Sequence, residues 1–454
     1  MKKLLMTGVA AVALAGTINM ASAAVPAEVA DRLGKDLTPL GAEQAGNADG
    51  SIPAWTGGIT QPPAGWKKGT HYVDPFSSDA PLYTITGQNL DQHRDKLSAG
   101  QIAMLTRHNT YKMDVYQSRR TCANTEASYQ RAKENAISAR LEEGGNGVGG
   151  AILTTPFPVP NNALEVAWNH MLRYRPFQIA AQSVNIIPTT GGSFVPTVVQ
   201  TDTIINYSNP AVKTTAELNN ISVYILFNTI APARLAGNVT LVHETLNQAA
   251  GPRNAWQYSP GTRRVRRAPN ISYDNPGTNS DGLSTSDSFD GYNGAPDRYN
   301  WTVLGKREQH IAYNNYKTQE EGLQYKTIIQ PGHVQQDLVR YELHRVWQIE
   351  ATLKQGARHV YSRRAFSLDE DTWSISTGDL YDGRGELWRT QEVWQGSAYD
   401  HPVCVTFGQV DYDIDARRYI AGGLRSEEKP VNYDAAELQV DRYTPDFIRR
   451  LGVR

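Results

Sequence analysis

The sequence has few cysteines and lacks the short motifs of the common enzyme classes. Only Cys122 and Cys404 occur in 454 residues, and no Cys-x-x-Cys redox motif is present. A Gly-x-Ser-x-Gly elbow, a His-Glu-x-x-His pair and a phosphate-binding loop are also missing, so the usual hydrolase, zinc-protease and nucleotide chemistries have no sequence support. The ten histidines are scattered, and each is more typical of a satisfied polar residue than of a ligand or base.

The chain also lacks an excess of one charge sign and, beyond its start, long apolar runs. Its formal net charge is −1 and its sequence pI is about 6.8, which does not indicate a nucleic-acid partner. After the first 23 residues no apolar stretch approaches the ~20 residues that a membrane span needs. The mature chain is therefore predicted to have no transmembrane span.

The first 23 residues have the pattern of a secretory signal peptide. Lys2 and Lys3 precede a mostly apolar run over 4–15, and Ala21-Ser22-Ala23 provides the small residues that signal peptidase accepts. No cysteine follows the run, so we expect no lipid anchor. The sequence predicts cleavage after Ala23 and export to the periplasm.

The predicted export bears on whether the two cysteines form a disulfide. In an oxidising compartment an even number of cysteines favours a disulfide, here between Cys122 and Cys404. The alternative is a pair of buried thiols, because sequence alone does not fix the geometry that a bridge needs.

Turn residues and large aromatics point to a β-rich fold. The chain has 38 Gly, 24 Pro, 23 Tyr and 9 Trp, which is typical of strands joined by tight turns. The clearest alternation, from Tyr341 to Leu353, predicts a long strand with one dry and one wet face. Further strands are predicted at 221–227, near 239–243, and at 360–366, 373–380, 387–394, 403–407 and 417–421, with a hairpin over 255–267. Short turns between them indicate an antiparallel meander in a single domain over 24–454.

Helices are predicted mainly over residues 91–142. A capping box of Ser98 and Gln101 begins the first, a second runs from about Asn124 to Leu141, and a short third lies near 162–171. Because the first two lack a strong apolar stripe, we expect them to lie on the sheet as a lid. The stretch 270–300 is rich in Asn, Asp, Ser and Gly and is predicted to be a long exposed loop.

Two charged groups allow more than one interpretation. Asp281, Asp287 and Asp290 could offer oxygen ligands to calcium, but their spacing fits no loop motif, and a solvated acidic loop is the simpler interpretation. The run 263–267, Arg-Arg-Val-Arg-Arg, either contacts lipid phosphates or an acidic partner, or protects an edge strand from aggregation.

Arg345 is the only charge on the apolar face of its predicted strand. Either an internal acid or snorkelling satisfies it, or it anchors the polar head of a ligand. Four tryptophans, at 347, 373, 388 and 394, fall in the late strands. They fill a core if the sheet is sandwiched and line a cavity if it is curled.

Several segments together resemble a family of exported Gram-negative proteins, domain of unknown function 1329. These segments are 49–58 (DGSIPAWTGG), 156–160 (PFPVP), 167–170 (AWNH), 255–267 (AWQY, PG and RVRR) and 443–447 (YTPDF). The family is similar to the LolA/LolB-like lipoprotein-sorting superfamily. The resemblance implies a β-dominated α+β fold, with a strongly curved antiparallel sheet forming a half-open barrel closed by N-terminal helices. It also implies an apolar cavity and association with resistance-nodulation-division exporters and outer-membrane proteins.

These observations lead to a non-enzymatic carrier of a lipid or an acylated protein as the main hypothesis. Its cavity is expected to be lined by Trp256, Tyr258, Trp347, Ile349 and Trp373, with Arg345 near a head group. An adaptor subunit of an envelope assembly is the second hypothesis, and an enzyme acting on an envelope lipid is the third. No cofactor, metal or nucleic acid is expected.

Overall fold

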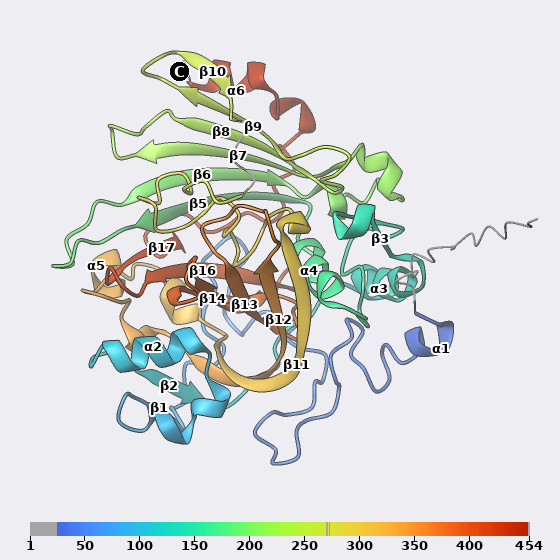
Figure 1. Ribbon diagram of the computed structural model, residues 1–454, viewed down its shortest axis with the longest axis vertical. Helices are drawn as coiled ribbons and strands as arrows, with labels where there is room; N and C mark the ends of the chain where they lie inside the picture. Colours follow the sequence, from blue (N-terminus) through green and yellow to red (C-terminus); the bar gives the residue numbers. More distant parts are fainter. Residues whose placement is uncertain (1–24, 269–270, 272, 453–454) are drawn as a thin grey trace, which may run out of the picture.

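The computed structural model describes residues 25–268, 271 and 273–452. The predicted signal peptide, residues 1–23, lies outside the described part of the chain. A large curved sheet runs through the molecule, from β10 at one end to β1 at the other (Figure 1). The prediction of a β-dominated α+β fold with a curved, open sheet is confirmed.

Fifteen of the strands in the described residues form this sheet. The strands are β1 (Tyr83–Ile85), β2 (Met113–Tyr116), β5 (Gln178–Ile186), β6 (Thr197–Ile204), β7 (Ile221–Ala231), β8 (Val239–Thr245), β9 (Asn254–Ser259), β10 (Arg264–Arg267), β11 (Tyr299–Ala312), β12 (Tyr341–Leu353), β13 (Arg363–Asp369), β14 (Ile375–Tyr381), β15 (Leu387–Ala398), β16 (Val403–Asp413) and β17 (Arg418–Leu424). A separate small hairpin joins β3 (Arg140–Glu142) and β4 (Gly147–Gly149).

The sheet order combines two meanders. It runs β1-β2-β12-β13-β14-β15-β16-β17-β5-β6-β7-β8-β9-β10, and β11 pairs with β12. The predicted late meander is present as β12 to β17, and the predicted hairpin as β9 and β10. One pairing departs from the antiparallel pattern, because β2 lies parallel to the start of β12.

The helices are short and lie against the sheet or beside it. They are α1 (Ala27–Ala30), α2 (Ala99–Arg107), α3 (Glu126–Ser138), α4 (Ala163–Leu172), α5 (Tyr325–Ile328) and α6 (Pro445–Gly452). The capping box predicted at Ser98 and Gln101 begins α2, and Asn162 caps α4. No helix in the described residues is long and apolar enough to cross a membrane.

Different elements pack against the two faces of the sheet. On the concave face, α4 and residues 273–298 pack against β7, β12, β13 and β14 around one apolar core. On the opposite face, α2 packs against β14 and β15, where Gly100 lies so close to Thr390 that a Cβ would collide with its side chain. Helices within 91–142 were expected to form a lid over the concave face, but α2 lies on the opposite face.

Two predictions of exposure are wrong. Most of the stretch 273–298 is buried or half-buried rather than exposed, with Asp287 at 2% and Tyr292 at 1% exposure. On the predicted wet face of β12, Glu342 and His344 are fully buried. In both cases polar side chains face polar groups of another segment instead of water, which a period-two pattern does not distinguish.

Candidate ligand-binding site

The concave face of the sheet is occupied by residues 273–298, here called the plug segment. It has little regular structure, and in Figure 1 it crosses in front of the middle strands as a yellow loop. Its contacts with the sheet fall into two groups. One group is polar and holds the segment at several points, and the other is aromatic.

Asp287 provides the first polar anchor. Its carboxylate accepts hydrogen bonds from Arg364 Nη2 of β13 at 2.7 Å and from Thr285 Oγ1 at 2.7 Å, and His359 Nε2 lies 3.1 Å away. Burial alone would raise the pKa of Asp287, but Arg364 and His359 hold it at about 2. The anchor is therefore an ion pair throughout the physiological pH range.

Asp290 provides a second anchor, this time to the end of α4. Arg173 Nη2 donates to its Oδ2 at 2.5 Å, and Thr406 Oγ1 of β16 donates to its Oδ1 at 2.7 Å. Burial would raise the pKa of Asp290, and Arg173 lowers it to about 2. His170 lies beside Arg173, and burial together with that guanidinium lowers its pKa to about 3. His170 is therefore neutral, and its Nδ1 accepts a hydrogen bond from the backbone N–H of Ile375 at 3.1 Å.

Amide side chains of the sheet provide a third anchor. Gln391 Nε2 of β15 and Gln409 Nε2 of β16 donate to the carbonyl of Ser288 at 3.2 and 2.9 Å. Both amides also donate to Asp411, at 2.8 and 2.9 Å. Burial raises the pKa of Asp411 to about 6, although these two hydrogen bonds oppose the rise.

The aromatic contacts place one ring of the plug segment into a cluster on the sheet. Tyr292 lies with its ring centroid 5.3 Å from that of Trp301 and 5.7 Å from that of Phe366. Near the same end, Phe289 approaches Phe227 of β7 at 6.5 Å and is 54% exposed. Tyr292 thus fills an apolar site that the sheet alone would leave open.

Gly291 allows this close approach. Its φ of +81° lies in the left-handed region, and a Cβ at this position would come within 2.7 Å of Ile375 Cγ2 in β14. The neighbouring plug glycine Gly282 has a similar φ of +74° but has no atom within 4 Å of a built Cβ. A side chain at either position would strain the backbone, but only a side chain at position 291 would also collide with a neighbouring residue.

Two pockets among the described residues are small in this conformation. One lies beside Phe76 and Arg340 and the other beside the disulfide, and each has a volume of about 10 Å³. That is room for about one water molecule, whereas ligand sites usually measure hundreds of cubic ångströms. Neither of these two pockets could hold a lipid in this conformation.

The six residues predicted to line a cavity lie in three places. Ile349 and Trp373 are buried in the concave core, with Trp347 stacked on Trp373 at 6.1 Å between centroids. Trp256 and Tyr258 belong to a second cluster, which α6 covers. Their role in ligand binding stays a prediction, and the first three are the ones that share a core with Tyr292.

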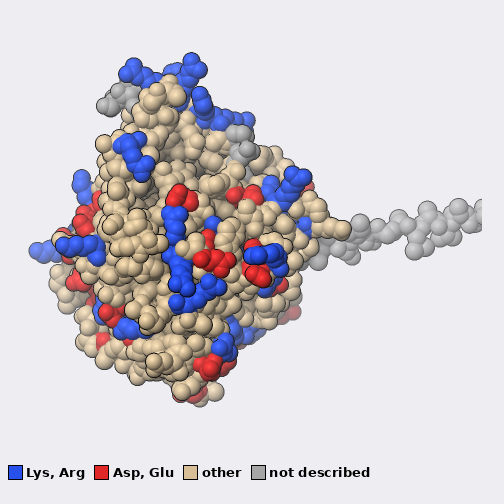
Figure 2. Space-filling model, turned by 60° about the vertical axis from the view of Figure 1, so that its left-hand side comes forward, with Lys and Arg blue, Asp and Glu red and all other residues tan. Residues whose placement is uncertain are grey.

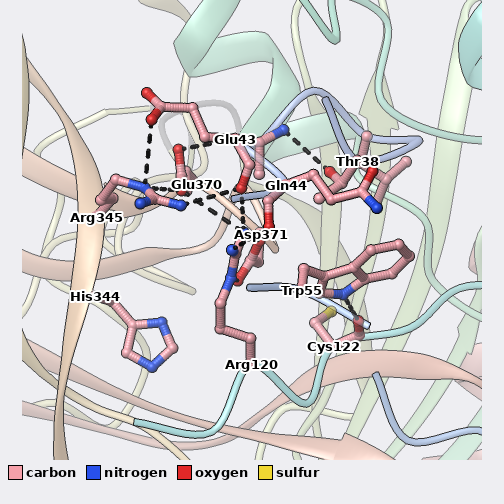
Figure 3. A network of polar contacts seen from close by, with 12 residues as sticks. Thr38, Glu43, Gln44, Trp55, Arg120, Cys122, His344, Arg345, Glu370 and Asp371 are labelled. Carbon is pink, nitrogen blue, oxygen red and sulfur yellow. Dashed lines mark hydrogen bonds and ion pairs between the residues drawn. The ribbon is translucent and has the colours of Figure 1, made fainter. Parts of the chain in front are cut away.

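Arg345, the sixth, meets an internal acid, as one of its two interpretations had it. Its Nε donates to Glu370 Oε1 at 2.5 Å and its Nη2 to the carbonyls of Glu43 and Ala45 at 3.0 and 2.7 Å (Figure 3). Arg120 lies beside it and donates to both carboxylate oxygens of Asp371 at 2.8 and 2.7 Å. Together the two arginines fix the N-terminal segment, residues 38–58, to the sheet.

His344, Asp369 and Asp371 stand close enough to hold a metal ion, with ligand atoms within 4.8 Å of one another. Every one of these groups already has a protein partner. Burial lowers the pKa of His344, but hydrogen bonds to Asp369 and Glu342 raise it to about 9, so the imidazole is protonated. A protonated imidazole and an arginine-bound carboxylate do not suit a cation.

The other predicted charges also have separate partners. Asp281, Asp287 and Asp290 pair with Arg418, Arg364 and Arg173 respectively, so the three aspartates do not share one calcium site. The motif over 168–170 is structural, because Trp168 donates to the carbonyl of Gly145 and Asn169 exchanges two hydrogen bonds with Phe157. The predicted disulfide between Cys122 and Cys404 is present.

The anchors of the plug segment were missed by the sequence analysis. Gln391, Gln409 and Asp411 form a polar period-two face on β15 and β16, and that alternation was the available signal. It predicts a polar face correctly, but it does not say that another segment covers this face.

The fold and the site define a β-rich protein whose curved sheet is covered on its concave face by one of the protein's own loops. Residues 84–449 match the family described as protein of unknown function (DUF1329), and the chain belongs to this family. It is 48% identical over 457 residues to an uncharacterized protein of Pseudomonas aeruginosa, covering 100% of this chain and 99% of that one.

Two solved structures are similar at low identity. One is an outer membrane lipoprotein-sorting protein domain from Vibrio parahaemolyticus, with 12% identity, a TM-score of 0.41, and coverage of 60% of this chain and 92% of that one. The other is a DUF1329 family protein from Desulfovibrio piger, with 16% identity, a TM-score of 0.40, and coverage of 59% and 90%.

Proposed function

We propose that the protein is a non-enzymatic carrier for a hydrophobic molecule, either a lipid or the acyl chain of a protein. The observation that carries the proposal is the position of Tyr292. An irregular segment packs this single ring against the stacked pair of Trp301 and Phe366 on the concave face, as a ligand would place an apolar group. Loading would exchange Tyr292 for the molecule that is carried.

The polar anchors of the plug segment are consistent with a segment that can detach from the concave face. Attraction within a buried ion pair is largely offset by the loss of hydration, so separating such a pair and returning both charges to water is less unfavourable than exposing apolar surface. Asp287 with Arg364 and Asp290 with Arg173 are pairs of this kind. The floor beneath them, with Trp301, Phe366 and Ile349, is apolar and would bind an acyl chain.

The predicted site of action is the periplasm, where no ATP is available. Transfer would then follow a difference in affinity between donor and acceptor. Association with a resistance-nodulation-division exporter and with outer-membrane proteins stays a prediction of the family resemblance. Cross-linking in intact envelopes, followed by identification of captured proteins, tests it.

The proposal is tested by binding of the apolar fluorescent probe N-phenyl-1-naphthylamine to Gly291→Ala and to its matched control Gly282→Ala. Both replacements put a side chain at a positive φ, which costs on the order of 1 kcal/mol. Only the first also collides with Ile375. Because each 1.4 kcal/mol lost by the closed state raises apparent affinity tenfold, we expect about tenfold tighter binding for Gly291→Ala than for the control.

Lipid extraction of protein purified gently from periplasm accompanies this measurement. A defined apolar molecule bound near one-to-one would support the carrier and name the class of cargo. If the wild type and Gly291→Ala both ignore the probe and yield no lipid, the carrier proposal fails. An empty protein with stoichiometric protein partners would support the adaptor hypothesis instead.

A further inference from the structure

Arginines from two distant parts of the sequence gather at one edge of the sheet. Arg263, Arg264, Arg266 and Arg267 lie in and beside β10, the last strand in the sheet order, and all four are exposed. Arg449 and Arg450 are exposed on α6, which packs against β8, β9 and β10. We call these six residues the basic rim. Figure 2 shows Lys and Arg side chains crowding this end of the molecule, with little acidic surface among them.

Most of this charge is not neutralised. Within the described residues, no carboxylate lies within 4 Å of the basic groups of Arg263, Arg264, Arg266 or Arg450. Arg449 contacts Asp446 at 3.3 Å, and that aspartate side chain is itself 75% exposed. For a chain whose net charge is −1, six arginines at one edge are a segregated positive field.

The backbone of β10 places its basic-rim arginines on both faces of the sheet, so a flat surface can contact all of them only by approaching the edge of the sheet. Val265 pairs with Tyr258 and Arg266 with Gln257, so neighbouring side chains of β10 point to opposite faces of the sheet. Arginines therefore stand on both faces of the outermost strand. A partner approaching one face would reach only some of them, whereas a plane approaching the edge reaches all of them.

The adjoining helix carries an aromatic ring suited to a membrane interface. Phe447 of α6 is half-buried, and the guanidinium groups of Arg442 and Arg450 lie 5.3 and 6.0 Å from its ring centroid. An apolar ring flanked by arginines fits the boundary between lipid phosphates and acyl chains. Protection of an edge strand explains charges on β10, but it does not explain the arginines of α6.

We propose that the basic rim docks the protein edge-on onto the anionic phospholipid surface of a membrane. Guanidinium groups bind phosphate through paired hydrogen bonds, and a continuous anionic surface matches an array that is spread over two elements and forms no pocket. This docking goes beyond the carrier proposal and does not require a cargo. It would hold even for an empty protein with the plug segment in place.

The test is co-sedimentation of the full protein with vesicles of phosphatidylcholine alone and of phosphatidylcholine mixed equally with phosphatidylglycerol. We expect binding to the mixed vesicles only, and release as salt is raised.

The variant R264Q/R266Q should bind on the order of twenty-fivefold more weakly, about fivefold for each arginine. R449Q/R450Q tests the rim without altering the strand. The matched control R94Q/R107Q changes net charge equally at the α2 end of the molecule (Figure 1).

Each outcome decides the proposal. Loss of binding in both rim variants, with the control unchanged, supports it. Equal loss in the control, equal binding to neutral vesicles, or no binding to mixed vesicles overturns it. Binding to soluble polyglutamate without binding to vesicles would also overturn it and would indicate an acidic protein partner. Failure of the carrier proposal would appear instead as missing lipid and missing probe fluorescence, with sedimentation intact.

Discussion

Asp411 is a buried carboxyl group whose hydrogen-bond donors are amides, and its proton equilibrium follows from that setting. Gln391 and Gln409 donate to it, while burial raises its pKa to about 6. By contrast, Asp287 and Asp290 face arginines and stay ionised. Three aspartates within one interface therefore differ in pKa because of their partners, and only Asp411 changes charge near neutral pH.

Replacing Asp411 with asparagine should stabilise the protein at neutral pH. The folded pKa of about 6 lies above the unfolded value of about 3.9, so the carboxyl lowers stability progressively as pH rises between these values, and the full cost remains above them. We expect Asp411→Asn to raise the free energy of unfolding by about 1–2 kcal/mol at about pH 7.5 and to change it little at about pH 4. Urea unfolding at both pH values checks this, and an equal effect at both would contradict the assignment.

The N-terminal segment over 38–58 shows how an element without regular structure is held in place. Arg120 donates to the carbonyl of Glu43 and, through Nη1, to the carbonyls of Gln44, Ala45 and Pro53. Its charge is neutralised by Asp371. A chain segment with few strand or helix hydrogen bonds thus obtains them from one buried guanidinium, and its position depends on that side chain.

The mutation Arg120→Met should release this segment. It leaves Asp371 buried without its partner, which costs about 3–5 kcal/mol. We expect a lower melting temperature and faster proteolysis within 38–58. The control Arg32→Met removes an ion pair with Asp36 whose side chains are 51% and 58% exposed, and such pairs contribute about 1 kcal/mol at most. Similar losses in both variants would show that the buried network is not what holds the segment.

At the scale of the whole molecule, the disulfide links the N-terminal part of the chain to the late meander. Cys122 lies shortly before α3, and Cys404 lies in β16 after a separation of 282 residues. Because the closed loop is long, the bridge restricts the unfolded chain strongly, by about 5 kcal/mol in the chain-entropy treatment. The stability of the sheet is therefore tied to an oxidising compartment.

Reduction should consequently lower stability without changing the fold. We expect the double variant Cys122→Ser/Cys404→Ser to lose about 2–5 kcal/mol of unfolding free energy while keeping its far-ultraviolet circular dichroism. A reducing agent should shift the melting temperature of the wild type and leave the variant unchanged. A shift of the same size in both proteins would mean that the bridge is not the cause.

The sequence by itself determined the elements. Period-two alternation predicted β12 to β17, and the Ser98 capping box predicted the start of α2, because side-chain direction and local hydrogen bonds are short-range properties. Two cysteines in a chain predicted to be exported favoured a disulfide between them. The family resemblance, which rested on several motifs in order, supplied the curvature of the sheet.

Only the tertiary structure decided what covers each face. The polar faces of β12 and β15 have the alternation of solvent-facing strands, and residues 273–298 have the composition of an exposed loop. In the fold these polar groups satisfy one another, as Asp287 does with Arg364 and the carbonyl of Ser288 with Gln391. Composition records that a residue is polar, but whether water or another segment supplies its hydrogen bonds depends on contacts between residues far apart in the chain.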